Sequence, residues 1–293
     1  MCIRDRGMET TLAQVANEIL GIPLEKTRLV HGDTAFTPYS TGTWGSRSMV
    51  MSGGAVAAAC DALAQRILRI GANLLQCTLD AAQLNNGVVE GPTGSIDVSQ
   101  IAHTWYLKPQ DLGEGVDPSG LEVTAGYKPE RDSGTFSYAT HAVVVAVDPY
   151  TGEVELLDYV IAEDGGVLVN PMVVDGQILG GLAQGIGTAL LEEMPYSPEG
   201  QPLASTLSEY LLPGATEVPD ASILHMQTPS PYTRFGVKGI GEGGCIAPPG
   251  AITNAINDAL YPLGAELNVL PVTPRRIVEA IASAVPRTPK NHA

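Results

Sequence analysis

One loop of this chain combines the residue types that acid–base chemistry at a bound ligand needs. The loop GVKGIGEGG, residues 236–244, holds one acid, Glu242, and one cation, Lys238, among glycines. Glycines let backbone amides approach a ligand closely and let the chain adopt positive φ. A carboxylate in such a loop, just before a helix, can act as a general base whose pKa is set by burial and nearby dipoles. A tight surface turn with a solvated glutamate is the simpler alternative.

The same glycines also fit a dinucleotide-binding fingerprint. Gly239, Gly241 and Gly244 satisfy the pattern GxGxxG, which needs a buried strand before it and a helix that opens at the third glycine. Here the residues TRFGVK precede the pattern, and Pro248 and Pro249 delay the helix. A nicotinamide site is therefore a disfavoured alternative.

A second polar loop comes before a long helix. The sequence GTWGSRS, residues 42–48, offers hydroxyl groups, two glycines and the guanidinium group of Arg47. These groups together suit a phosphate or a polar heterocycle, because arginine can make paired contacts to such groups. A capped turn without any ligand explains the same residues equally well.

A glycine-interrupted helix is expected over residues 173–193. Gln177 and Gln184 lie seven residues apart in it, which is two helical turns, so they share a face. A glutamine amide beside glycines can read a ligand's hydrogen-bonding edge. Each interior glycine costs about 1 kcal/mol relative to alanine. Close helix packing explains these glycines as well as a ligand does.

Helices and strands must position these residues, and they alternate along the chain. Residues 84–135 read as strands and turns broken by glycine and proline. Apolar periodicity predicts helices over 11–20, 52–75 and 173–193 and from Pro249 and Pro274, and strands over 141–148, 153–164 and 222–228. This alternation predicts an α+β fold with more than one sheet, in two subdomains.

Composition narrows the class of protein. The chain of 293 residues is 44% hydrophobic, which is enough for one or two buried cores. Its net charge of −16 argues against nucleic acid as a partner, since that affinity rests on clustered lysine and arginine. Charged residues make up 16%, where about 25% is usual, which indicates that other chains cover part of the surface.

Cysteine and histidine spacing gives no local metal site. The four cysteines contain no CxxC pair and the five histidines never fall at ligand spacing, so neither zinc nor an iron–sulfur cluster is expected in this chain. No run reaches the ~20 apolar residues of a membrane helix. A reducing cytoplasm is the expected compartment.

Seven segments in order resemble the C-terminal half of the large, molybdenum-binding subunit of the xanthine dehydrogenase, aldehyde oxidase and carbon monoxide dehydrogenase family. They are METTLAQVANEILGIP (8–23), GDT (32–34), TGTWGSRS (41–48), DPYTGEVELLDYVIAEDGGVLVNP (148–171), GQILGGLAQGIG (176–187), YSPEG (196–200) and VKGIGEGG (237–244). The resemblance covers nearly the whole chain and implies a cofactor cleft between two subdomains of mixed sheets packed with helices.

The resemblance also implies the site. Its cofactor is molybdenum held by molybdopterin, in the cytosine dinucleotide form, with no side chain assigned as a metal ligand. Glu242 is then the base that deprotonates the molybdenum-bound hydroxyl group. The residues implied to bind the cofactor are Gly45, Ser46, Arg47, Ser48, Gln184, Lys238, Gly239 and Gly241.

The implied reaction is oxidative hydroxylation of a small molecule, an aldehyde, CO or an aromatic N-heterocycle, with water as the oxygen source. Electrons would leave through partner subunits that carry FAD and [2Fe-2S] clusters. The family's first half is missing here, so the isolated chain is expected to be inactive, and a truncated, non-catalytic cofactor-binding or assembly module is the alternative. We expect residues 1–7 to be a non-native start, 8–120 the first part of the molybdopterin-binding region and 121–293 its second part.

Overall fold

The computed structural model describes residues 6–114, 116, 120–131 and 135–284 of the chain, which form two compact units. Unit 1 comprises Met1–Thr135 and Ser230–Lys238, and unit 2 comprises Phe136–Pro229 and Gly239–Ala293. The chain therefore returns to unit 1 over residues 230–238, which include the first three residues of the glycine loop. The expected division at residue 120 concerns the cofactor-binding region and stays a prediction. Most of the expected non-native start lies outside the described residues.

Unit 1 packs three helices against a small sheet. Its core contains Ile67 and Ile70 from one helix, Val89 from the sheet and Ile101 from another helix, all almost fully buried. The antiparallel sheet has the strand order β1-β2-β3. Its elements are α1 (Met8–Leu20), η1 (Leu24–Lys26), η2 (Met49–Gly53), α2 (Gly54–Leu74), η3 (Leu79–Ala81), β1 (Gln83–Asn85), β2 (Val88–Gly91), β3 (Gly94–Asp97), α3 (Val98–Leu107), η4 (Pro109–Asp111) and η6 (Arg234–Gly236).

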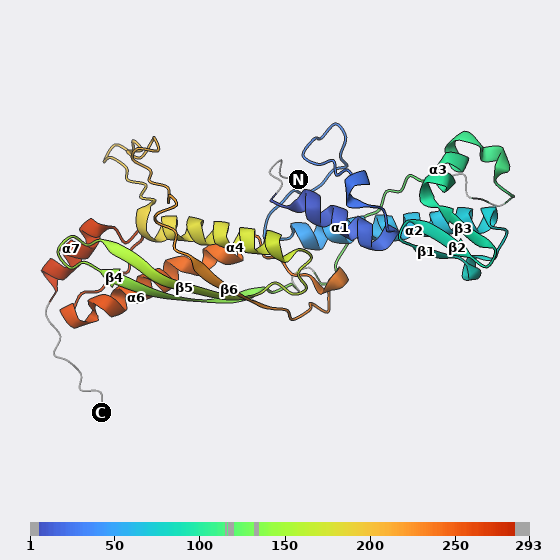
Figure 1. Cartoon of the computed structure of the whole chain (residues 1–293). Helices are drawn as coiled ribbons and strands as arrows, with labels where there is room; N and C mark the ends of the chain where they lie inside the picture. The colour runs from blue at the N-terminus through green and yellow to red at the C-terminus, as the bar shows by residue number, and fades with distance from the viewer. Residues whose placement is uncertain (1–5, 115, 117–119, 132–134, 285–293) are drawn as a thin grey trace, which may run out of the picture. The chain divides into compact units, whose positions relative to one another are not determined.

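Unit 2 packs long helices along a three-stranded sheet (Figure 1). Strands β4 and β5 pair antiparallel, and β6 pairs parallel to β5 after a crossover that includes α4. A parallel neighbour needs such a crossover, because both strands must run the same way. Its elements are β4 (Tyr138–Val147), β5 (Val154–Asp164), α4 (Pro171–Ile186), η5 (Gly187–Leu191), β6 (Ala221–Met226), α5 (Gly243–Ile246), α6 (Pro248–Leu260), η7 (Tyr261–Leu263) and α7 (Pro274–Ser283).

The core of unit 2 follows from the apolar spacing of α4. Ile178, Leu182 and Ile186 recur every four residues and are fully buried, so one side of the helix faces the sheet. Tyr159 and Ile161 of β5 alternate inward to meet them. This packing fixes both α4 and the carboxyl end of β5, which are the elements beside the glycine loop.

The α+β fold with two sheets is confirmed, and so are the hairpin, the strand before residue 228 and the helices that begin near residues 249 and 274. One helix was missed, because 84–135 was expected to hold only strands and turns. Asp97 caps α3 there, since its carboxylate accepts a hydrogen bond from the amide of Ser99 at 2.7 Å.

No helix in the described part of the chain is long and apolar enough to cross a bilayer.

Candidate functional site

Glu242 stands at the N-terminal end of the short helix α5, on an exposed turn of unit 2. Its neighbours Gly243 and Gly244 continue into the helix, and Gly244 is buried. None of the glycines at 239, 241, 243 and 244 has a positive φ. These glycines are therefore not needed for unusual backbone angles, and at Gly244 the reason for glycine is close approach.

That close approach is to helix α4. A β carbon on Gly181 would lie 2.8 Å from the Cα of Gly244, and one on Gly244 would overlap the carbonyl oxygen of Ile178. One turn further along α4, a β carbon on Gly185 would lie 2.6 Å from Cγ of Pro248. Backbone packing therefore fixes the turn of Glu242 against α4, which is the packing explanation that the sequence left open.

A second set of residues on α4 and the start of η5 is exposed. Gly176, Gly180 and Gln184 of α4 and Thr188 of η5 recur every four residues and are all exposed, so they form one stripe. A β carbon on Gly176 or Gly180 would have nothing within 4 Å among the described residues. Packing within unit 2 therefore does not account for these two glycines, and the amide of Gln184 lies on the same open stripe.

The polar loop of unit 1 is held in an uncommon conformation. Gly45 and Ser46 both have left-handed backbone angles, with φ of 58° and 56°. Such angles in a residue other than glycine cost roughly 1–2 kcal/mol and are concentrated at functional sites. The guanidinium carbon of Arg47 lies 4.4 Å from the ring centre of Trp44. Ser48 donates or accepts a hydrogen bond with the hydroxyl of Thr43 at 3.2 Å.

The predicted site residues fall in both units. Gly45, Ser46, Arg47, Ser48 and the buried Lys238 belong to unit 1, whereas Gln184, Gly239, Gly241 and Glu242 belong to unit 2. Within unit 2, α4 and α5 bring Gln184 and Glu242 onto packed elements. The cofactor roles of all these residues stay predictions.

The dinucleotide fingerprint lacks its structural context. The segment before Gly239 is η6 (Arg234–Gly236) rather than a buried strand, and β6 has already ended at Met226. The helix near the third glycine, α5, has only four residues. Because a nicotinamide site needs strand, turn and helix in direct succession, these residues do not form one.

Sequence reasoning missed a group of buried polar residues behind the turn of Glu242. Glu163, at the end of β5, is 3% exposed, and its Oε2 would lie 3.5 Å from a β carbon on Gly243. Its Oε1 lies 3.4 Å from Nδ1 of His225, whose Nε2 lies 2.7 Å from Oδ1 of Asp175. Burial raises the pKa of the Glu163 carboxyl group, while the facing His225 acts in the opposite direction. The sequence feature that could have pointed to this cluster is the pair of adjacent acids, Glu163 and Asp164, at the end of a predicted strand.

The next residue, Asp164, is fully buried and well supplied with donors. It accepts hydrogen bonds from the hydroxyl of Tyr138 at 2.9 Å, the amide of Gly166 at 2.9 Å and the amide of Thr228 at 3.1 Å. Such bonds compensate a buried carboxylate for its lost hydration. Asp164 therefore ties β4, the end of β5 and the segment after β6 together beside Glu163.

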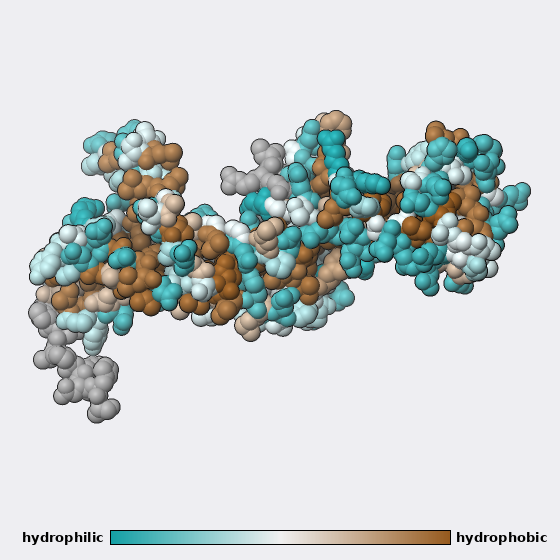
Figure 2. Space-filling view, in the orientation of Figure 1, coloured by the Kyte–Doolittle hydropathy of each residue, from teal (hydrophilic) through white to brown (hydrophobic). Residues whose placement is uncertain are grey.

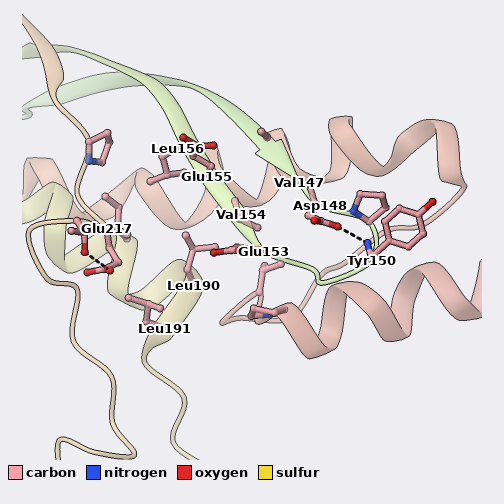
Figure 3. A pocket seen from close by; sticks show the side chains of 17 residues that line it. Val147, Asp148, Tyr150, Glu153, Val154, Glu155, Leu156, Leu190, Leu191 and Glu217 are labelled. Carbon is pink, nitrogen blue, oxygen red and sulfur yellow. Dashed lines mark hydrogen bonds between the residues drawn. The ribbon is translucent and has the colours of Figure 1, made fainter.

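A cavity of about 960 Å³ lies at the other end of the same sheet, where β4 turns into β5 (Figure 3). Asp148, Glu153, Glu155 and Glu217 line it, and none of the predicted site residues does. Amide donors at Tyr150 and Thr151 hold the pKa of Asp148 below its usual value, so that group stays ionised. An acidic lining repels a phosphate-bearing cofactor, so this cavity is not the predicted site.

The chain is similar to known proteins over most of its length. Residues 6–219 match the family described as molybdopterin cofactor-binding domain. The nicotine 6-hydroxylase large subunit of Paenarthrobacter nicotinovorans is 38% identical over 278 residues, which are 94% of this chain and 34% of that protein. The carbon monoxide dehydrogenase large chain of Hydrogenophaga pseudoflava is 32% identical over 94% of this chain and 34% of its own length.

Solved structures show the same fold. Quinoline 2-oxidoreductase from Pseudomonas putida 86 superposes with a TM-score of 0.88 at 34% identity, over 97% of this chain and 36% of that one. The chain spans about a third of the length of the curated relatives that it matches.

Proposed function

Because this chain belongs to the molybdopterin cofactor-binding domain family, we propose that it is the C-terminal, cofactor-binding part of a molybdenum hydroxylase large subunit. The open stripe of α4 beside the packed turn of Glu242 is the observation that carries the proposal. Nicotine 6-hydroxylase and quinoline 2-oxidoreductase are both named for aromatic N-heterocycles, which favours that substrate class over an aldehyde or CO.

The residues present fit a molybdopterin cofactor on three counts. Gly176 and Gly180 leave space where a flat ring system can lie against helix α4. The amide of Gln184 is exposed on the same stripe and can donate to or accept from the ring's polar edge. In unit 1, Arg47 presents a planar guanidinium group that matches a phosphate, next to two open glycines at 42 and 45.

We assign each side chain a role on this basis. Arg47, Ser46 and Ser48 bind phosphate or pterin oxygens, together with the backbone amide of Gly45. Gln184 and the backbone at Gly239 and Gly241 orient the pterin, and Lys238 contributes positive charge. The cofactor when bound, in the cytosine dinucleotide form by resemblance, supplies the redox chemistry and the transfer of oxygen from water.

Glu242 is the proposed general base. Its carboxylate accepts a proton during hydroxylation, which requires a fixed position and exclusion of bulk water. The contact of Gly244 with α4 supplies the fixed position. Glu242 is exposed in this chain, so the remaining two thirds of a large subunit would have to cover it.

Unit 2 offers partner chains a binding surface on the segment between η5 and β6. Between η5 and β6 the chain runs out as an arm from the end of α4, and its exposed apolar side chains give it a partly hydrophobic surface (Figure 2). The exposed apolar residues of the arm are Met194, Tyr196, Leu203, Leu207, Leu211 and Leu212. An exposed apolar surface of this kind marks a site of contact with another protein. We assign it to the rest of the enzyme, with FAD and [2Fe-2S] on partner subunits.

The test uses this sequence within its complete large subunit and enzyme. Glu242→Gln keeps the size of the side chain and removes its basicity, so turnover should fall by about a hundredfold or more while molybdenum content stays at the wild-type level. Glu155→Gln, an exposed glutamate on β5, is the matched control and should keep full turnover. Near-normal kcat in Glu242→Gln would refute the assignment of the base.

The exposed Glu242 also favours a second candidate, a non-catalytic cofactor-binding or assembly module. Turnover of the assembled enzyme separates the two. Loss of turnover in Glu242→Gln at full molybdenum content supports the enzyme, whereas unchanged turnover supports the module.

A further inference from the structure

Three titratable side chains of unit 2 form a row that ends at the turn of Glu242. Glu163 on β5 and His225 on β6 are direct partners in the parallel register of the two strands. Asp175 reaches the same histidine from α4, so both ring nitrogens of His225 face carboxylates, at 3.4 Å and 2.7 Å. Side-chain exposure rises along the row, from 4% at Glu163 through 20% at His225 to 46% at Asp175.

The inner end of this row lacks hydrogen bonds. Glu163 Oε1 and His225 Nδ1 are buried, and neither has a hydrogen-bond partner within the described residues. A proton on either atom turns this contact into a donor facing an acceptor, whereas its loss leaves two lone pairs facing each other. An unpaired buried polar atom is costly, so the pair is best satisfied when it holds one proton.

The other oxygen of Glu163 lies close to the turn. Oε2 lies 3.5 Å from the position that a β carbon would take on Gly243, the residue that follows Glu242. Outside the turn's own backbone, no other atom of the described residues comes within 4 Å of that position, so the carboxyl group of Glu163 is the neighbour of the turn on this side. The opposite side of the turn rests on α4 through Gly244.

We propose that Glu163 is a positioning residue for Glu242, and that the proton it shares with His225 keeps the turn in place. This inference rests on the proposed function of Glu242. While it is bound, the shared proton ties the end of β5 to β6 next to the turn. When that proton is lost, the contact at 3.4 Å turns repulsive and the support of the turn weakens.

The neighbouring acids act in one direction and His225 in the other. Asp175 and Asp164 are carboxylates near Glu163, and both favour retention of the proton by electrostatic repulsion of a further negative charge, whereas His225 favours the ionised carboxylate. Asp164 is committed to its own bonds with Tyr138, Gly166 and Thr228, so it leaves His225 to Glu163 and Asp175.

The sign of the pH effect follows from the raised pKa of Glu163. A carboxyl group whose pKa is higher in the folded state than in the unfolded one stabilises the fold at low pH, and this contribution is lost as pH rises through the folded value. The turn should therefore loosen as pH rises. In Glu163→Gln the amide can donate to Nδ1 at every pH, so this dependence should disappear.

Amide hydrogen exchange of residues 243–245 in the 293-residue chain measures the order of the turn without any cofactor. We expect protection in the wild type to fall by about tenfold from the acidic to the alkaline end of a pH series, after correction for intrinsic exchange. Glu163→Gln should show the same protection throughout the series, and Glu163→Ala low protection throughout. Glu155→Gln, the same substitution at an exposed glutamate of the same strand, should match the wild type.

Turnover of the assembled enzyme gives the second measurement. Glu163→Ala should lower kcat by about tenfold or more at unchanged KM and molybdenum content, a range usual for groups that hold a catalytic residue in place. Glu163→Gln should rescue kcat at neutral pH and remove the alkaline loss of activity. If Glu163→Ala does not fold, the pH dependence of Glu163→Gln decides.

The outcomes separate this inference from the proposed function. Equal protection and equal pH dependence in the wild type, Glu163→Gln and Glu155→Gln would overturn the positioning role. If the protection of the turn depends on pH but Glu242→Gln keeps normal kcat, then Glu163 still positions the turn, and Glu242 is not the general base.

Discussion

Gly181 of helix α4 and Gly244 of the Glu242 turn are in backbone contact, because a β carbon on Gly181 would lie 2.8 Å from the Cα of Gly244. The preceding residue of the helix, Gly180, has open space instead. A β carbon on Gly180 would have nothing within 4 Å among the described residues. Two neighbouring glycines in one helix thus have different reasons to be glycine.

Alanine at these two positions should change stability in opposite directions. Gly180→Ala removes the helix penalty of glycine and should raise the free energy of unfolding of the 293-residue chain by about 0.5–1 kcal/mol. Gly181→Ala must push the turn away from α4 and should lower the free energy of unfolding by about 1–3 kcal/mol. Urea unfolding of both variants measures the difference, and equal midpoints would contradict the contact.

Gly180→Ala should also weaken cofactor binding. If the open stripe of α4 takes the pterin, the added methyl group occupies the space in which the ring would lie. Molybdenum content of the assembled enzyme should then fall severalfold, even though the chain itself becomes more stable. Gly250→Ala, which adds the same methyl group at an exposed position of α6 with nothing within 4 Å among the described residues, serves as the control. Full molybdenum content in Gly180→Ala would place the cofactor elsewhere.

The sequence predicted the strongly periodic elements well and the site geometry only in part. The spacing of Ile178, Leu182 and Ile186 indicates a helix directly, because local spacing determines which side is buried. Helix α3 was missed, since its start depends on the single cap of Asp97. The sequence placed glycines at 180, 181 and 185 without separating their roles, because only the fold decides which of them meets another backbone.

The cluster behind the turn was beyond the reach of sequence spacing. Glu163 and His225 are separated by the whole crossover through α4 and the arm, and only the parallel register of β5 and β6 makes them neighbours. Asp175 joins them from a third element. Long-range contacts of this kind follow from topology, which local patterns do not encode.

Arg47→Lys should reduce cofactor content despite the retained charge. The guanidinium group of Arg47 lies 4.4 Å from the ring centre of Trp44, and its planar fork can pair with two phosphate oxygens. Lysine offers neither the stacking nor the fork. We expect the molybdenum content of the assembled enzyme to fall by about tenfold, which corresponds to about 1.4 kcal/mol of binding. The exposed Arg275, changed to lysine in the same way, should leave molybdenum content unaltered.

Tyr138→Phe should destabilise unit 2 through Asp164. The hydroxyl of Tyr138 donates to the fully buried carboxylate of Asp164 at 2.9 Å, and a hydrogen bond to a charged group contributes about 1.5–3 kcal/mol. Loss of that donor should lower the free energy of unfolding by a similar amount. Tyr150→Phe, at a tyrosine that is 90% exposed, removes the same atom from the surface and should change stability by less than about 0.5 kcal/mol. Urea unfolding at neutral pH compares the stability of the two variants. Because Asp164 lies beside Glu163, Tyr138→Phe should also speed amide exchange at Gly243. Equal stability of the two variants would mean that the amides of Gly166 and Thr228 alone satisfy Asp164.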